Sequence, residues 1–112
     1  MDKQNKQIVS MVFSFRNEEK VLQKLIEKVE NTINETGYEY ELIFVNDAST
    51  DKSLKILDEN RRRNDRIKII NMSRKFGVAP CIIAGYNHAI GEAVIHMDTD
   101  LQDPPEVIPK LI

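Results

Sequence analysis

The residues best suited to chemistry in this sequence are two aspartates, Asp98 and Asp100, in the stretch VIHMDTDLQDPPE. They follow an apolar run, residues 93–97, that is typical of a buried strand. If the extended conformation continues, both carboxylates point to the same side and repel each other unless a cation lies between them. Oxygen ligands favour Mg²⁺ or Mn²⁺ over zinc. A polar turn before a helix explains the same spacing, so the spacing alone leaves both interpretations open.

The neighbouring polar residues of this stretch have simpler interpretations. His96 has the same parity as the aspartates but falls inside the strand, so we expect a buried, hydrogen-bonded core histidine rather than a ligand. Asp103 and Glu106 have the spacing of a capping box, and Pro105 suits the first turn of a helix. Asp103 is therefore predicted to cap a helix that begins there.

The elements that must position these residues alternate between strand and helix. Short β-prone runs predict strands at residues 8–15, 40–46, 67–72 and 93–97. A helical pattern after the first strand is expected to be capped by Asn17 and to end at Gly37, with an apolar stripe formed by Leu22, Leu25, Ile26, Val29 and Ile33. Alternation of this kind predicts an α/β fold, a parallel sheet with helices on both faces in the order βαβαβαβα.

Two further helices are predicted between the later strands. The first follows the turn DASTD, where Ser49, Thr50 or Asp51 can act as the cap, and it turns Leu54, Ile56 and Leu57 inward. The second, VAPCIIAGYNHAIG, carries Pro80 in its first turn and Gly91 just past its end.

In parallel sheets, ligands bind beyond the carboxyl ends of the strands. The chemistry is therefore expected at residues 14–18, 46–51 and 98–102. Asp47 would lie in this crevice and could accept a hydrogen bond from a nucleobase, or it could form an Asx-turn or helix cap, which Asp51 suits better. Neither G-x-G-x-x-G after the first strand nor G-x-x-x-x-G-K-[ST] is present, which argues against a dinucleotide enzyme or a P-loop NTPase.

The composition indicates one soluble globular domain of 112 residues. The net charge of −2 gives no electrostatic reason to expect nucleic-acid binding.

Cys81, the single cysteine, lies in an apolar stretch and is predicted to be core. No apolar run is long enough to span a membrane, and the start is no signal peptide. The sequence ends within the helical pattern IPKLI, so we expect it to be part of a longer protein.

Together, these stretches resemble the family 2 glycosyltransferases, and most of all the polyprenyl-phosphate sugar transferases of the dolichol-phosphate mannose synthase type. The matching segments are VFSFRNEE, YELIFVNDASTD, IKIINMSRKFG and CIIAGYNHAIGEAVIHMDTDLQDPPE. They occur in the family's order, and SRKFG and DTDLQDPPE are specific to that subgroup. The resemblance implies a GT-A type fold, a nucleotide-diphosphate sugar donor such as a UDP- or GDP-sugar, and Mg²⁺ or Mn²⁺ as cofactor.

The resemblance also implies roles for individual residues. Asp98 and Asp100 match the family's metal-binding DxD, and Gln102 matches a further metal-site position. Positions that line the nucleotide pocket or lie near the donor are matched by Asn17, Glu18, Asp47, Arg74 and Gly77, together with Asp98.

The sequence departs from the family at four positions near the expected site. Arg16 replaces a tyrosine, which puts base stacking there in question unless the arginine plane substitutes. Lys75 stands where asparagine is frequent, Asn46 where the first of two aspartates is common, and Glu92 where aspartate is more usual. The family's acceptor pocket and catalytic base lie further along than Ile112, so residues 1–112 resemble the donor-binding half.

The function that follows is metal-dependent, inverting transfer of a sugar from a nucleotide-diphosphate donor to a polyprenyl phosphate or saccharide acceptor. We expect the full-length protein at the cytoplasmic face of a membrane, with membrane contact only through parts beyond this chain. An incomplete sheet also favours homo-oligomers. Two alternatives are a receiver-like phospho-accepting module, which the polar residues at the strand ends fit poorly, and a fragment that binds nucleotide without activity.

Overall fold

A parallel sheet with helices on both faces forms the part of the chain that can be described. The computed structural model describes residues 8–97, and residues 1–7 and 98–112 lie outside this range. The strands are β1 (Ile8–Phe15), β2 (Glu39–Asn46), β3 (Ile67–Asn71) and β4 (Ala93–His96), and the helices are α1 (Leu22–Thr36), α2 (Ser53–Arg63) and α3 (Val78–His88). This order confirms the predicted alternation, while the helix predicted after Asp103 lies outside the described residues.

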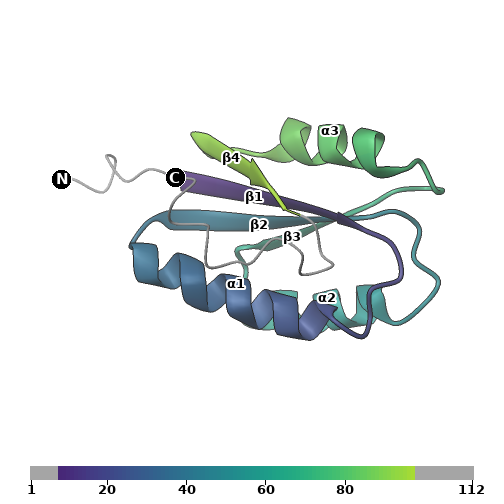
Figure 1. Cartoon of the computed structure of the whole chain (residues 1–112), viewed down its shortest axis with the longest axis horizontal. Helices are drawn as coiled ribbons and strands as arrows, with labels where there is room; N and C mark the ends of the chain where they lie inside the picture. Colours follow the sequence, from purple (N-terminus) through teal and green to yellow (C-terminus); the bar gives the residue numbers. More distant parts are fainter. Residues whose placement is uncertain (1–7, 98–112) are drawn as a thin grey trace.

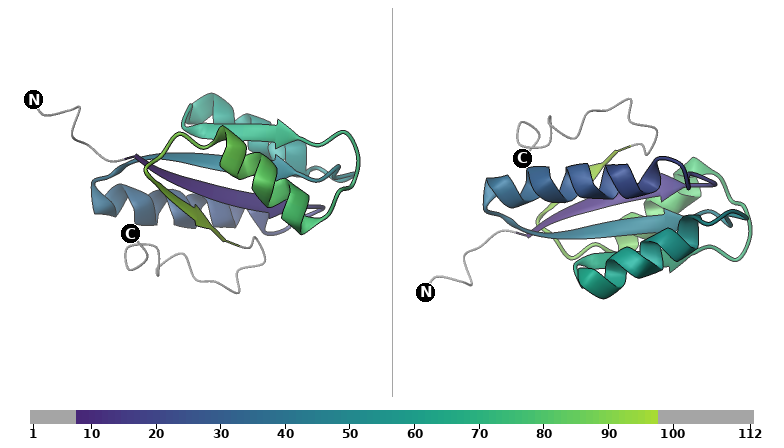
Figure 2. Two further views of the ribbon diagram at one scale, coloured as in Figure 1. Left: turned by 90° about the horizontal axis from the view of Figure 1, so that it is seen from above. Right: turned by 90° about the horizontal axis from the view of Figure 1, so that it is seen from below.

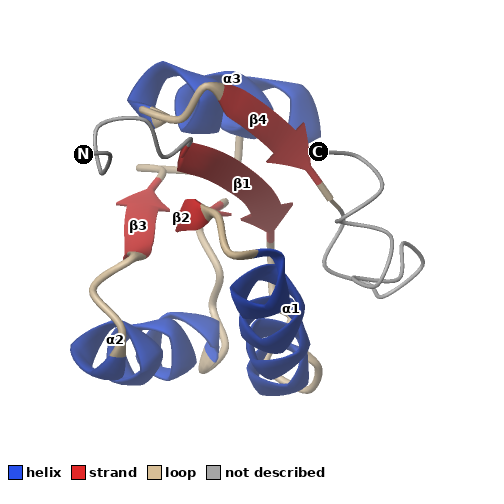
Figure 3. Cartoon of the chain, turned by 90° about the vertical axis from the view of Figure 1, so that its left-hand side faces the viewer, coloured by secondary structure: helices blue, strands red, loops and turns tan. Residues whose placement is uncertain are grey.

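All strand pairs are parallel, and the strand order is β3-β2-β1-β4. Helices α1 and α2 lie side by side on one face, and α3 lies alone on the other (Figures 2 and 3). The loops that follow β1, β2 and β3 all emerge at one end of the sheet, toward which β4 also points (Figure 1). The sheet therefore presents its carboxyl edge as one row of loops.

The larger core lies between the sheet and helices α1 and α2. Helix α1 buries Leu22, Leu25, Ile26, Val29 and Ile33, so the apolar stripe predicted for this helix is confirmed. These side chains pack against alternate residues of the strands, where the rings of Phe13 and Phe44 stack with centroids 4.8 Å apart. Burial of this many large apolar side chains is the main force that fixes α1 on the sheet.

The core under α3 is smaller and partly polar. Val12, Ile43, Val45 and Cys81 form its apolar part, which confirms the prediction that Cys81 is buried. The outer side of α3 stays apolar, with Ile83 59% exposed. Self-association through such a surface stays a prediction.

A buried carboxylate, that of Glu41 on β2, fastens the segment between α3 and β4 to the sheet. Its Oε2 accepts hydrogen bonds from the Ser10 hydroxyl and from the backbone N–H of Ile90, while its Oε1 pairs with the Lys68 ammonium. The Ser10 hydroxyl oxygen in turn accepts from Gly91 N–H at 2.8 Å. These bonds set where β4 begins.

Acidification is expected to remove the stability that Glu41 contributes. Burial alone raises the pKa of this carboxyl, but hydrogen bonds from Lys68, Ser10 and Ile90 outweigh it and hold the pKa below its ordinary value of 4.5. Because the folded-state pKa is the lower one, the contribution is complete above about pH 4.5 and disappears as the pH falls through the folded value. Urea unfolding across this pH range should show a weaker pH dependence for Glu41→Gln than for the wild type. Equal slopes would contradict this role.

Several boundaries differ from the sequence-based expectations. Helix α1 begins at Leu22, several residues after Asn17, because a turn at Glu18 precedes it. The N-cap position of α2 is Lys52, but the Asp51 carboxylate accepts the N–H of Ser53 at 2.9 Å, as predicted for a cap. Gly91 is not the end of α3, which stops at His88.

The predictions for the inward face of α2 and for His96 are each partly corrected. In α2, Leu57 is fully buried, whereas Leu54 and Ile56 are only half-buried. The ring nitrogen Nε2 of His96 is buried but has no hydrogen-bond partner among the described residues, so the expected hydrogen bond is not found there. The residue paired with His96 across the sheet is Val12, whose side chain offers no polar group.

Candidate functional site

A pocket of about 420 Å³ opens among the loops at the carboxyl edge of the sheet. Its lining comes from the ends of β1 and β2, the loop before α3 and the first turns of α3, and it comprises Ser14, Phe15, Arg16, Asn17, Asp47, Lys75, Gly77, Val78 and Cys81. Three residues predicted to line a nucleotide pocket, Asn17, Asp47 and Gly77, are therefore brought together.

Asp47, directly after β2, holds the loop between β3 and α3. Its Oδ1 accepts the N–H of Phe76 at 2.7 Å and its Oδ2 accepts the N–H of Gly77 at 2.9 Å. Burial alone raises the pKa of this carboxyl, but these two bonds, the Cys81 thiol and the charge of Lys75 hold the pKa below its usual value. The alternative of an Asx-turn or a cap for the next helix is thus wrong for Asp47.

Gly77 has the backbone conformation that this bond requires. Its φ of 97° lies in the left-handed region, which L-residues with a side chain rarely adopt. No atom lies within 4 Å of where a Cβ would stand, so the restriction comes from the backbone and not from crowding. A glycine at position 77 therefore allows the chain to enter α3 while the N–H of Gly77 points at Asp47.

Asn17 ties the loop after β1 to the loop after β2. Its Oδ1 accepts the N–H groups of Thr50 at 2.7 Å and Asp51 at 3.2 Å, and its own N–H donates to the Ser49 hydroxyl at 2.9 Å. A positive φ of 57° turns the residue toward these partners. The predicted capping of α1 by Asn17 is therefore corrected, because its side chain is used more than 30 residues away in sequence.

A second set of bonds strengthens the same connection. The N–H of Glu18 donates to the Ser53 hydroxyl at 3.0 Å, and the N–H of Glu19 donates to Asp51 Oδ2 at 3.2 Å. In return, the Glu19 carboxylate accepts the N–H of Lys52 at 2.8 Å. The two loops thus form one hydrogen-bonded unit beside the pocket.

Two of the predicted nucleotide-binding residues are not among the described residues that line this pocket. The Arg74 guanidinium stacks over the ring of Phe76, with its carbon 4.1 Å from the ring centroid. Glu18 contributes backbone bonds at the start of α1 and to α2. Contact of either residue with a donor stays a prediction.

The departures from the family pattern have structural consequences at this edge. Arg16 and Lys75 both line the pocket. The sequence suggested the Arg16 plane as a stacking substitute for the family's tyrosine, whereas Lys75 was assigned no role. Asn46 donates from its amide nitrogen to Asn71 on β3 at 3.0 Å and accepts the N–H of Ser49 at 2.9 Å. An aspartate at position 46 could accept but not donate, which explains why an amide suits this position.

The predicted metal ligands Asp98, Asp100 and Gln102 lie outside the described residues. Residues 8–97 contain no group of three or more His, Cys, Asp or Glu side chains that could hold a metal ion. Strand β4 runs parallel to β1, and Met97 N–H donates to Val12 O at 3.2 Å. Strand β4 therefore points toward the carboxyl edge.

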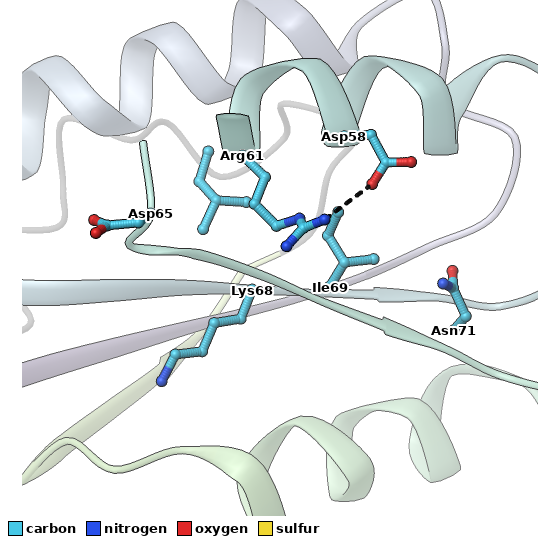
Figure 4. Close-up of a pocket in the computed structure, with 7 residues that line it drawn as sticks. Asp58, Arg61, Asp65, Lys68, Ile69 and Asn71 are labelled. Carbon is cyan, nitrogen blue, oxygen red and sulfur yellow. Dashed lines mark ion pairs between the residues drawn. The ribbon is translucent and has the colours of Figure 1, made fainter. Parts of the chain in front are cut away.

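A second groove of about 500 Å³ lies along the outer edge of the sheet, between α2 and β3 (Figure 4). Arg61 Nη2 and Asp58 Oδ1, 3.9 Å apart, form an ion pair along α2, on the helix side of this groove. Lys68, also in its lining, is paired with Glu41. The charges of Asp58, Arg61 and Lys68 are already paired, and most of the groove's lining lies away from the carboxyl-edge loops. This groove is therefore a weaker candidate for a ligand site than the carboxyl-edge pocket.

The fold and the pocket together define an α/β domain with a pocket at the carboxyl edge of a parallel sheet, the edge at which such folds bind their ligands. Residues 10–112 match the family described as glycosyl transferase family 2. The chain belongs to this family. The match favours the glycosyltransferase interpretation over a receiver-like module.

Relatives are named as glycosyltransferases. The uncharacterized glycosyltransferase YkcC of Bacillus subtilis is 43% identical over 103 residues, covering 92% of this chain and 32% of the relative. The undecaprenyl-phosphate 4-deoxy-4-formamido-L-arabinose transferase of Proteus mirabilis is 44% identical over 106 residues, covering 93% and 32%. The chain therefore spans about a third of the length of these relatives.

Solved structures share the fold. S. aureus TarS 1-349 in complex with UDP-GlcNAc matches with a TM-score of 0.73 and 26% identity, over 82% of this chain and 26% of that one. The mannosyltransferase PcManGT from Pyrobaculum calidifontis, in complex with GDP-Man and Mn²⁺, matches with a TM-score of 0.68 and 24% identity, over 88% and 29%. The fold is therefore of the GT-A type, as the resemblance implied. In the part of the chain that is described, no helix has the length and hydrophobicity needed to cross a membrane.

Proposed function

We propose that this chain binds the nucleotide-diphosphate sugar donor of a family 2 glycosyltransferase. The observation that carries the proposal is the carboxyl-edge pocket, which gathers Asn17, Asp47 and Gly77 in a chain of this family. A similar chain, TarS, has been solved with UDP-GlcNAc, which supports a nucleotide sugar as ligand. The loops around the pocket are held by hydrogen bonds, so the site is formed before the donor arrives.

We assign different roles in donor binding to different residues of this chain. Asp47 fixes the loop that lines one side of the pocket, and Asn17 joins the two loops beside it. Beyond β4, Asp98, Asp100 and Gln102 would hold a divalent cation, Mg²⁺ or Mn²⁺. Such an ion, when bound, neutralises charge that develops on the leaving diphosphate. Direct attack by the acceptor oxygen on the anomeric carbon would give inversion.

The acceptor we propose is a polyprenyl phosphate. The name of the Proteus mirabilis relative, an undecaprenyl-phosphate transferase, supports a lipid phosphate. We also propose that the full-length protein acts at the cytoplasmic face of a membrane. A phosphate acceptor is already anionic and needs little help from a general base. Because the chain spans about a third of such relatives, we expect residues 1–112 to bind the donor without completing transfer alone.

Calorimetric titration tests the proposal. A UDP- or GDP-sugar should bind the wild-type chain, and Mn²⁺ should tighten binding by about tenfold or more, since the ion bridges protein carboxylates and diphosphate. Asp98→Ala should abolish the increment from Mn²⁺ while leaving the metal-free affinity. Asp58→Ala removes an equal charge from the far groove and should change neither. A folded sample that binds neither donor, with or without Mn²⁺, would refute the proposal.

A further inference from the structure

The outer side of α3 differs from the outer sides of the other two described helices. Val78–His88 contains no Asp, Glu, Lys or Arg, whereas α1 and α2 carry exposed charged residues such as Lys24 and Glu59. Helix α3 also lies alone on its face of the sheet, so no helix of the described part of the chain covers its outer side (Figure 3). Because the outer side of a surface helix is typically charged or polar, we expect α3 to contact something other than water.

Large apolar side chains are concentrated on this side of the molecule. Among residues 8–97, seven large apolar residues are exposed, and five of them lie between positions 76 and 90. These five are Phe76, Val78, Ile83, Tyr86 and Ile90. Tyr86 lies three residues after Ile83 and eight after Val78, so these three residues share one side of α3. Exposed apolar residues are normal when scattered singly, whereas a cluster marks a surface that contacts another molecule.

A cationic loop leads into this apolar side. Arg74 and Lys75 precede α3, and no Asp or Glu lies between Asp65 and Glu92 in the sequence. The Arg74 guanidinium stacks over the Phe76 ring, with its carbon 4.1 Å from the ring centroid, so a cation and an apolar ring are presented together. The stretch from β3 to β4 thus combines positive charge and exposed apolar surface without an acidic residue.

Positive charge beside apolar surface complements an anionic lipid bilayer. Lys and Arg are attracted to acidic head groups, while aliphatic and aromatic side chains enter the boundary between head groups and acyl chains. Tyr86 suits this boundary, because a tyrosine ring is apolar and its hydroxyl is polar. A second copy of the chain fits less well, since its own α3 side would add the same cations and no acid.

We propose that the outer side of α3 docks on a bilayer that contains anionic lipids. The docking surface, named the α3 face, comprises Arg74, Phe76, Val78, Ile83, Tyr86 and Ile90. Membrane contact is then made within this chain as well as through parts beyond it. The pocket at the carboxyl edge shares Val78 with the α3 face, so it would open beside the lipid. The docking itself requires neither donor nor metal, and it goes beyond the proposed function.

Sedimentation of the full chain with lipid vesicles, without nucleotide or metal, tests the docking. Vesicles of equal parts phosphatidylglycerol and phosphatidylcholine should bind the wild type at low salt, and vesicles of phosphatidylcholine alone should bind it at least about fivefold more weakly. Ile83→Gln removes exposed apolar surface and should weaken binding to the mixed vesicles by about tenfold. Arg74→Gln removes one cation, so it should weaken binding by about fivefold and reduce its dependence on salt.

Two exposed positions away from the α3 face provide matched controls. Tyr38→Gln, between α1 and β2, and Lys24→Gln, on α1, should leave vesicle binding unchanged. Urea unfolding should give nearly equal stabilities for all four variants, because each changed side chain is exposed. Ile83→Gln should also keep its affinity for a nucleotide sugar, so the failure of this inference and the failure of the proposed function are separate results.

Three outcomes would overturn the docking. The first is a folded wild-type chain that does not sediment with the mixed vesicles. The second is a loss of binding in Tyr38→Gln as large as the loss in Ile83→Gln, which would indicate adsorption without a defined surface. The third is a wild-type dimer in sedimentation velocity that Ile83→Gln converts to a monomer, which would assign the α3 face to a second copy of the chain.

Discussion

Asp47→Ala is expected to abolish nucleotide binding and to lower the free energy of unfolding by about 3 kcal/mol. The substitution removes a buried carboxylate that accepts the N–H groups of Phe76 and Gly77. The loop itself is largely exposed, but the bonds of both donors to Asp47 are part-buried, and hydrogen bonds to a charged group contribute more than neutral ones. Without the carboxylate, the loop loses the contact that holds Lys75 and Gly77 along the pocket.

Hydrogen exchange and urea unfolding measure this effect. The amides of Phe76 and Gly77 should exchange far faster in Asp47→Ala, while amides of β1 change only by the global loss of stability. Asp58→Ala, at a half-exposed position of α2, should change the unfolding free energy by less than about 0.5 kcal/mol. Unchanged protection of Phe76 and Gly77 in Asp47→Ala would show that other contacts hold this loop.

Gly91→Ala is expected to destabilise the fold by about 3 kcal/mol and to displace the start of β4. A Cβ at position 91 would stand 2.5 Å from the Ser10 hydroxyl oxygen, 2.7 Å from the carbonyl oxygen of Ile8 and 2.8 Å from the Ser10 nitrogen. Two of these atoms belong to the backbone of β1, which is a central strand and cannot move independently. Relief must therefore come from the segment that includes Ile90 and Gly91.

The displacement has a functional readout. Glu92 N–H donates to Ile8 O at 2.9 Å and sets the register of β4, which leads to Asp98. In Gly91→Ala, the tightening of donor binding by Mn²⁺ should therefore be reduced more than metal-free binding. Glu92→Ala, at an exposed neighbouring position, should leave both unfolding and binding nearly unchanged. Full retention of stability in Gly91→Ala would mean that the approach to β1 is looser than the structure indicates.

Sequence patterns were sufficient where the physical cause is local. The apolar stripe of α1 repeats at helical spacing, so its five buried residues could be identified before the sheet was known. Asp51 could be assigned as a cap because its partner, the N–H of Ser53, is two residues away. The alternation of strands and helices follows from the same local periodicities, and it implies a parallel sheet.

Asn17 shows where such patterns fail. It precedes a helical pattern and is a good capping residue, yet its Oδ1 bonds to Thr50 and Asp51 on another loop. Glu41 is similar, since its partners Ser10 and Ile90 are 31 and 49 residues away. Bonds between residues so far apart depend on which strands are neighbours, and no spacing along the chain encodes this.

The sequence by itself determined the order of strands and helices, the faces that are buried and, through matched motifs, the resemblance to family 2 glycosyltransferases. Only the tertiary structure decided that the strand order β3-β2-β1-β4 brings Arg16, Asp47 and Lys75 around one pocket. It also decided that Asp47 holds a loop in addition to facing the pocket. The reason is physical: periodicity reports which side of an element is apolar, whereas a site depends on the pairing of elements distant in sequence.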